Sequence, residues 1–157
     1  MLIEFITKNT AGRFPHKTSQ GNQYLLVIYD YDSNAILAEP LKTRFAGEMT
    51  KAWMKIHDKL AQQGTAPSIY IIDNEASLEL KNAVKKKQVS YQLVPPHVHC
   101  QNAAERAIRT FKNHLLAILA RPEKENPVSE WDRFLPQCEM TLNFLRNSRV
   151  NPTLSSC

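Results

Sequence analysis

One run of six apolar residues at 24–29, Tyr-Leu-Leu-Val-Ile-Tyr, constrains the fold more than any other feature of the sequence. A run this short, this rich in β-formers and this uniformly apolar is typical of a strand that is buried on both faces of a sheet. Helices must then cover that sheet. The sequence therefore predicts an α/β architecture.

Apolar periodicity predicts the other elements around this strand. The predicted strands cover 2–7, 24–29, 34–39, 68–73 and 89–94, and the predicted helices cover 45–60, 76–87, 104–119 and 131–145. A tight turn at 32–34 makes the second and third strands a hairpin, and the whole reads as a mixed five-stranded sheet flanked by helices. In the last helix we expect Ser129 and Asp132 to form a capping box and Pro136 to introduce a kink.

Composition excludes several classes of protein. The 157 residues suit one ordinary domain, and 43% hydrophobic with 22% charged residues fits neither a disordered chain nor a membrane protein. No apolar run could span a bilayer, so we expect no membrane partner. The net charge of +5 permits a nucleic-acid partner without requiring one. Cys100, Cys138 and Cys157 form no paired motif, which favours reduced thiols in an intracellular protein.

Two carboxylates are placed where a metal site could form. Asp73 ends a buried strand, and Glu105 lies in the first turns of the helix that follows the next strand. If those strands are neighbours, both carboxylates can converge on one edge of the sheet, as Mg²⁺ ligands do. The simpler alternative is that Asp73 caps the helix starting near Asn74 and that Glu105 is a solvated helix residue. When either residue is considered alone, this simpler alternative is the better interpretation.

The surroundings of Glu105 favour the metal hypothesis. Gln101, Glu105, Arg109 and Lys112 share one helical face, opposite an apolar stripe. A metal-holding carboxylate followed by two cations suits a phosphodiester, because the cations can bind the phosphates next to the scissile one. A surface helix with salt-bridging charges would show the same pattern.

Other polar residues carry weaker signals. His97, His99 and Cys100 follow a Pro-Pro pair, but no fourth ligand has zinc-site spacing, so we interpret them as loop residues near the active edge. Asp30 and Asp32 follow a strand and are interpreted as turn formers.

Six short sequence pieces occur in order along the chain, and together they indicate a protein family more specifically than any one of them does. They are Gly12-Arg13-Phe14-Pro15, Gly21-Asn22-Gln23-Tyr24, Asp30-Tyr31-Asp32-Ser33-Asn34-Ala35-Ile36, Asp73-Asn74-Glu75-Ala76-Ser77, Asn102-Ala103-Ala104-Glu105-Arg106-Ala107-Ile108-Arg109-Thr110-Phe111-Lys112 and Trp131-Asp132-Arg133. With these pieces the chain closely resembles the catalytic core of retrotransposon and retroviral-type integrases, from about Lys8 to Asn151.

The resemblance implies a ribonuclease H-like fold and a DDE polynucleotidyl transferase. It implies a triad of two Asp and one Glu that holds two divalent ions, Mg²⁺ or Mn²⁺, with Asp73 as the second Asp and Glu105 as the Glu. The implied reactions are 3′-end processing, with water as nucleophile, and strand transfer, with the DNA 3′-hydroxyl as nucleophile. The implied partners are element-end DNA, target DNA and further copies of the chain, and a eukaryotic element would act in the nucleus. We expect His97, Gln101, Arg109 and Lys112 to contact DNA.

The sequence departs from this family at the first Asp, where it has Asn9. An amide oxygen can bind a metal but brings no charge, so we expect the second metal site to weaken most. Glu4, Asp30 and Asp32 are candidate substitutes, although nothing in their spacing shows that they reach the site.

Three hypotheses therefore stand side by side. The first is an integrase core, active or recently inactivated. The second is a non-catalytic DNA-binding or self-association module that keeps the fold. The third is a ribonuclease H-like nuclease that cuts without joining.

The sequence also bears on the domain boundaries. No His-His-Cys-Cys zinc module precedes the core-like region, and the sequence stops at Cys157, shortly after Asn151-Pro152. We therefore expect 1–157 to be one catalytic-core-like domain without the flanking modules of integrases.

Overall fold

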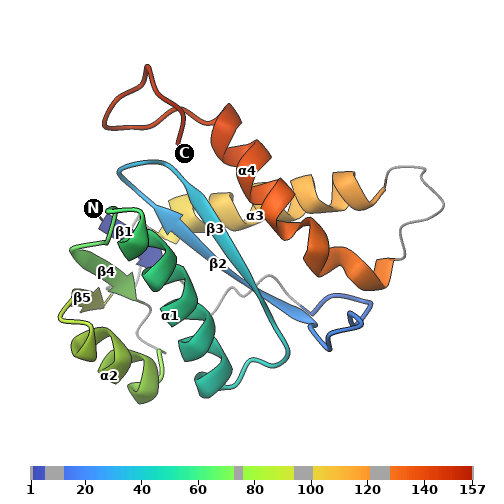
Figure 1. Ribbon diagram of the computed structural model, residues 1–157, viewed down its shortest axis with the longest axis horizontal. Helices are drawn as coiled ribbons and strands as arrows, with labels where there is room; N and C mark the ends of the chain where they lie inside the picture. The colour runs from blue at the N-terminus through green and yellow to red at the C-terminus, as the bar shows by residue number, and fades with distance from the viewer. Residues whose placement is uncertain (1, 6–12, 73–75, 94–100, 121–127, 157) are drawn as a thin grey trace.

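The computed structural model describes residues 2–5, 13–72, 76–93, 101–120 and 128–156. Its strands are β1 (Leu2–Phe5), β2 (Tyr24–Asp30), β3 (Ile36–Leu41), β4 (Ile69–Ile72) and β5 (Ser90–Leu93) (Figure 1). Its helices are α1 (Ala46–Gln62), α2 (Leu78–Lys86), α3 (Gln101–Leu119) and α4 (Leu135–Leu145), with a 3₁₀ segment η1 (Val128–Phe134) before α4. The predicted order of strands and helices is confirmed.

The sheet has the strand order β3-β2-β1-β4-β5. Strand β2 runs antiparallel to both of its neighbours, β3 and β1, whereas β1, β4 and β5 run parallel to one another. Phe5 pairs with Ile72, and Ile72 pairs with Leu93, so the three parallel strands end in register at one edge. Ligands of α/β sheets bind at such an edge.

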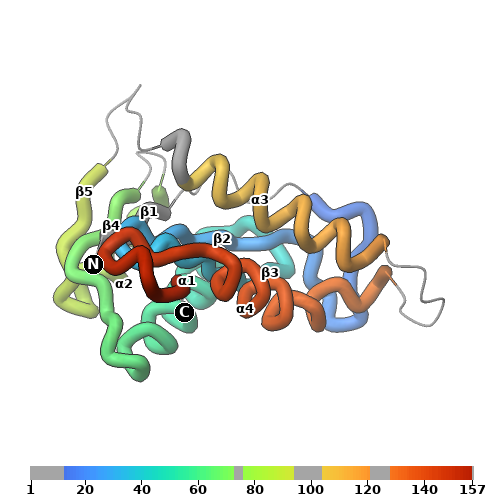
Figure 2. Tube along the Cα trace, turned by 90° about the horizontal axis from the view of Figure 1, so that it is seen from above, coloured from blue at the N-terminus to red at the C-terminus, as the bar shows by residue number. Residues whose placement is uncertain are grey.

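Both faces of β2 are covered, as its sequence predicts. Leu25, Val27 and Tyr29 pack on one side with the apolar residues of α3, η1 and α4. Leu26 and Ile28 pack on the other side with α1, α2 and β4. Figure 2 shows α3 on one side of the strands and α1 and α2 on the other, which is the layered α/β architecture expected from the sequence.

The last predicted helix is wrong in two details. Residues 128–134 form the 3₁₀ segment η1, and α4 begins only at Leu135. Pro136 therefore lies in the first turn of α4, where its missing N–H costs no hydrogen bond, and it does not kink a helix interior. Asp132 does not act as the expected cap partner of Ser129: its carboxylate accepts a 2.8 Å hydrogen bond from the Asn22 side chain.

Three of the six family-like sequence pieces meet around η1, where they stabilise the fold. The rings of Phe14 and Trp131 stack with centroids 4.2 Å apart, and the indole N–H of Trp131 donates to the His16 carbonyl at 3.0 Å. Gly21 adopts φ +88°, which side chains rarely tolerate, in the turn that presents Asn22 to Asp132. These pieces serve packing around η1.

Two further sequence expectations concern membranes and cysteines. Within the described part of the chain, no helix is long and apolar enough to cross a membrane. Cys138 is a buried free thiol, and burial raises its pKa to about 11, so it stays protonated and unreactive at neutral pH. Cys100 and Cys157 lie outside the described residues.

Candidate functional site

The edge where β1, β4 and β5 end carries the predicted metal site. Asp73 follows β4 directly, and Asn9 and His97 each come four positions after the end of β1 and of β5. The parallel pairing therefore brings the three strand ends that precede these residues to one edge. Asn9, Asp73 and His97 lie outside the described residues, so their approach to Glu105 stays a prediction.

Helix α3 has the two faces expected from its spacing. Ala104, Ala107, Ile108, Phe111 and Leu115 are buried against β2, and Ile118 and Leu119 pack beside them. On the other face Glu105 and Lys112 are half-buried and Arg109 is exposed. Gln101 starts the helix, with its side chain outside the described part. Glu105 lies in the second turn of α3.

Asp30 is confirmed as a turn former. Its carboxylate accepts hydrogen bonds from the backbone N–H of Asp32 (3.1 Å) and of Ser33 (3.2 Å), and from the Ser33 hydroxyl. Burial nonetheless raises the pKa of this carboxyl above its usual range. Asp30 pairs with Ile3 at the start of β1, at the opposite end of that strand from the predicted metal site, which argues against Asp30 as a substitute ligand.

No preformed metal cluster is present in the part of the chain that the structure describes. Within it, no three His, Cys, Asp or Glu side chains are grouped to hold an ion. The residues weighed for zinc, His97, His99 and Cys100, lie outside it together with Asp73.

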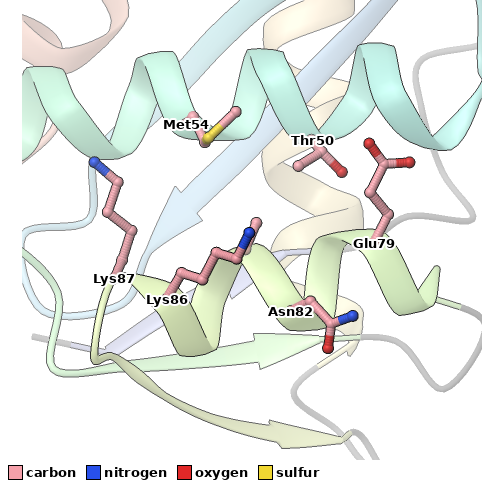
Figure 3. Close-up of a pocket in the computed structure, with 7 residues that line it drawn as sticks. Thr50, Met54, Glu79, Asn82, Lys86 and Lys87 are labelled. Carbon is pink, nitrogen blue, oxygen red and sulfur yellow. The ribbon is translucent and has the colours of Figure 1, made fainter.

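A groove of about 620 Å³ lies between α1 and α2 (Figure 3). Glu79 reaches toward α1 at one end, and Lys87 bridges the other end through a 2.6 Å ion pair with Asp58. Thr50 faces the groove, and its buried hydroxyl has no hydrogen-bond partner among the described residues. The lining has Glu79 at one end and Lys86 and Lys87 toward the other, so the groove does not offer a polyanion a uniformly positive surface.

A smaller hollow of about 310 Å³ has a very different lining. Its walls are Tyr29, Arg106, Ala107, Thr110, Arg146 and Arg149, so it contains three arginines and no acidic residue. None of these arginines is predicted as a site residue from the sequence. Arg106 belongs to α3, whereas Arg146 and Arg149 follow α4, and only the fold brings them together. We call this hollow the arginine pocket.

Solved structures show which fold this is. The chain is similar to the HTLV-2 integrase catalytic core domain in complex with magnesium, at 18% identity and a TM-score of 0.69, over 99% of this chain and 92% of that one. The chain has an integrase catalytic-core fold. The BIV integrase catalytic core domain matches at 17% identity and a TM-score of 0.66, over 99% of this chain and 90% of that one.

The integrase-core fold also occurs inside a larger assembly. A simian T-cell lymphotropic virus intasome in complex with a PP2A regulatory subunit matches at 18% identity and a TM-score of 0.73. That match covers 99% of this chain, which spans 52% of the intasome chain. No family model and no curated protein matches the sequence. At these identities the likeness establishes the ribonuclease H-like fold.

Proposed function

We propose that residues 1–157 form the catalytic core of a DNA integrase, which trims element ends and joins them to target DNA. The observation that carries the proposal is the integrase-core fold along 99% of the chain, with the strand ends that precede Asn9 and Asp73 side by side in the sheet. Asp73 and Glu105 stand at the family's second Asp and Glu positions.

The chemistry of the donor set suits a hard divalent ion. Asp73 and Glu105 offer carboxylate oxygens and Asn9 an amide oxygen, which are the ligands that Mg²⁺ and Mn²⁺ prefer. Such ions, when bound, would activate the attacking oxygen and stabilise the leaving oxygen of an in-line displacement. With Asn9 the set carries one negative charge fewer than in the family, so we expect weaker binding of the second ion.

The cations of α3 would position the DNA. Arg109 is exposed and Lys112 half-buried, one and two helical turns beyond Glu105. Phosphate contacts from this face would fix the strand relative to the carboxylates without reading its sequence. Gln101 and His97 would add contacts near the start of α3.

Self-association belongs to the same proposal. The HTLV-2 core is known in trimeric and dimeric forms, and the simian protein in an intasome. In this chain Met140, Phe144 and Leu145 of α4 are exposed, as are Val150 and Leu154 after it. A cluster of exposed large apolar side chains is typical of a protein–protein interface.

A second candidate is a non-catalytic DNA-binding or self-association module. Asn9 favours it, because removing a bridging carboxylate impairs metal-dependent chemistry while leaving the fold and the α3 cations in place. The two candidates predict different metal binding.

Calorimetric titration with Mg²⁺ and Mn²⁺, beside a plasmid nicking assay, tests the proposal. The unmodified chain should bind at least one ion, and Glu105→Gln should abolish that binding. Glu139→Gln is the matched control, because Glu139 lies on α4, where its carboxylate pairs with Lys59. No metal binding together with intact DNA binding would favour the non-catalytic module.

A further inference from the structure

The arginine pocket brings three guanidinium groups to one small hollow. Arg106 comes from α3, and Arg146 and Arg149 come from the end of α4 and the arm that follows it. No residue that lines the pocket is acidic, and the Thr110 side chain adds a hydroxyl donor. Guanidinium and hydroxyl groups together give the hollow the N–H and O–H donors that an anion accepts.

Arg146 is fixed by the β2–β3 turn. Its Nε–H donates to the Asn34 carbonyl at 2.8 Å, and its Nη2 donates to the Asn34 side-chain oxygen. The same Asn34 oxygen accepts the Tyr29 hydroxyl at 2.8 Å, and the guanidinium lies 5.8 Å from the centre of the Tyr29 ring. The side chain is therefore oriented before any ligand arrives.

Arg149 is held by aromatic rings. Its guanidinium lies 5.7 Å from the centre of the Tyr29 ring and 5.4 Å from that of Tyr31. Contacts of this kind hold the planar group while leaving its N–H donors at the edge available to an anion. Arg149 itself is exposed, so a ligand can reach it.

The arm at 147–156 that carries Arg149 is tied to the hairpin. The backbone N–H groups of Arg149 and Val150 both donate to the Asp32 carbonyl, at 3.1 and 3.2 Å. Asn147 forms an isolated β-bridge with Ser155, which closes the arm on itself beside the turn (Figure 1). These bonds make the pocket part of the folded scaffold.

We propose that the arginine pocket binds one phosphate group of the DNA backbone, at a site separate from the predicted metal edge. Guanidinium groups bind phosphate through paired N–H donors. Three guanidinium groups offer more donors than a single carboxylate needs, so phosphate is the better match for the pocket. Arg106 lies one turn from Arg109 on α3, so a strand held by the Arg109–Lys112 face can continue to the pocket. This inference rests on the proposed DNA-binding function.

Inorganic pyrophosphate, titrated into the whole chain by calorimetry, probes the pocket without DNA. We expect Arg149→Gln and Arg106→Gln each to weaken its binding by about tenfold, since each removes a charge-assisted hydrogen bond. Arg133→Gln is the matched control, because Arg133 is an exposed arginine paired with Glu130 on η1. The double variant should lose less than the product of the single losses, because both residues bind one anion. Equal pyrophosphate affinity in all variants would overturn the proposal.

Duplex DNA binding at several salt concentrations separates the pocket from the proposed function. Arg149→Gln should lower the salt dependence by about one unit in slope, in addition to the effect of Lys112→Ala. A response to Lys112→Ala without one to Arg149→Gln would overturn the assignment to DNA. A response to Arg149→Gln without one to Lys112→Ala and Arg109→Ala would support the pocket and contradict the proposed α3 DNA face.

Discussion

The side chain of Asn143 forms both hydrogen bonds that a neighbouring strand would give to Ile36. Its oxygen accepts the Ile36 N–H and its amide donates to the Ile36 carbonyl, each at 2.9 Å. Two positions along β3, the Ala38 N–H donates to Glu139 of α4 at 3.2 Å. Helix α4 thus satisfies the outer edge of β3, the kind of strand that otherwise invites pairing with another chain.

Asn143→Ala should therefore destabilise the protein by about 2–4 kcal/mol, because it leaves a buried N–H and a buried carbonyl without partners. Urea unfolding followed by circular dichroism measures the change. Asn113→Ala, at an exposed position of α3, is the control and should change the free energy of unfolding by a few tenths of a kcal/mol. A similar loss in both variants would contradict the role of Asn143.

Local pattern made most of the fold predictable. The six apolar residues of β2, the period of α1 and the two faces of α3 are properties of neighbouring residues, and the structure confirms them. Bonds between distant residues were not predictable. Asp132 pairs with Asn22, 110 positions away, and Asn143 pairs with Ile36, 107 positions away. Local spacing alone therefore misassigned Asp132 to a cap and Pro136 to a helix interior.

One part of the candidate site was predictable from local spacing and another part was not. The Glu105, Arg109 and Lys112 face follows from helical spacing. The arginine pocket does not, because Arg149 reaches it only through the hydrogen bonds between the arm and the Asp32 carbonyl. The one sequence signal for this pocket was a pair of arginines, Arg146 and Arg149, after the last helix. Because the segment that carries them is irregular, their spacing along the chain did not predict where their side chains would lie.

Stability should depend on pH through His57. This ring is buried, stacks on Trp53 and lies 2.9 Å from the Tyr70 hydroxyl, and burial, followed by nearby Lys87, lowers its pKa below 6.5. As pH falls, the unfolded chain therefore takes up this proton first. The contribution of His57 is complete above pH 6.5 and is lost as pH falls through its lower folded pKa.

His57→Gln isolates this effect, because the other titrating groups remain in both proteins. The difference in unfolding free energy between the unmodified chain and His57→Gln should shrink from about pH 7.5 to about pH 5. Thermal or urea unfolding at several pH values measures it. A difference that stays constant over that range would show that the His57 pKa is not lowered.

The exposed apolar side chains of α4 predict self-association. Phe144 is 64% exposed beside exposed Met140 and Leu145, so Phe144→Asp should shift the chain toward monomer in sedimentation equilibrium. Phe45→Asp is the matched control, because Phe45 is 77% exposed at the start of α1. If both variants associate like the unmodified chain, α4 is not the interface.

Arg109→Ala and Lys112→Ala should weaken DNA binding about equally for all sequences. Each loss of a phosphate contact should also lower the salt dependence by roughly one unit in slope. Fluorescence anisotropy with two unrelated duplexes at several salt concentrations measures both effects. Unchanged salt dependence would mean that this face of α3 is only solvated.

Metal-dependent nicking and strand transfer by Asn9→Asp, measured beside the unmodified chain, tests the central claim most directly. Restoring the carboxylate returns a ligand that can bridge two ions, and we expect its absence to cost on the order of 10³-fold or more in rate. We therefore predict a poor catalyst that Asn9→Asp activates, with Asp73→Asn as the background control for contaminating nuclease. Strong activity of the unmodified chain above that control, with no gain from Asn9→Asp, would contradict the account and assign the third ligand to another residue.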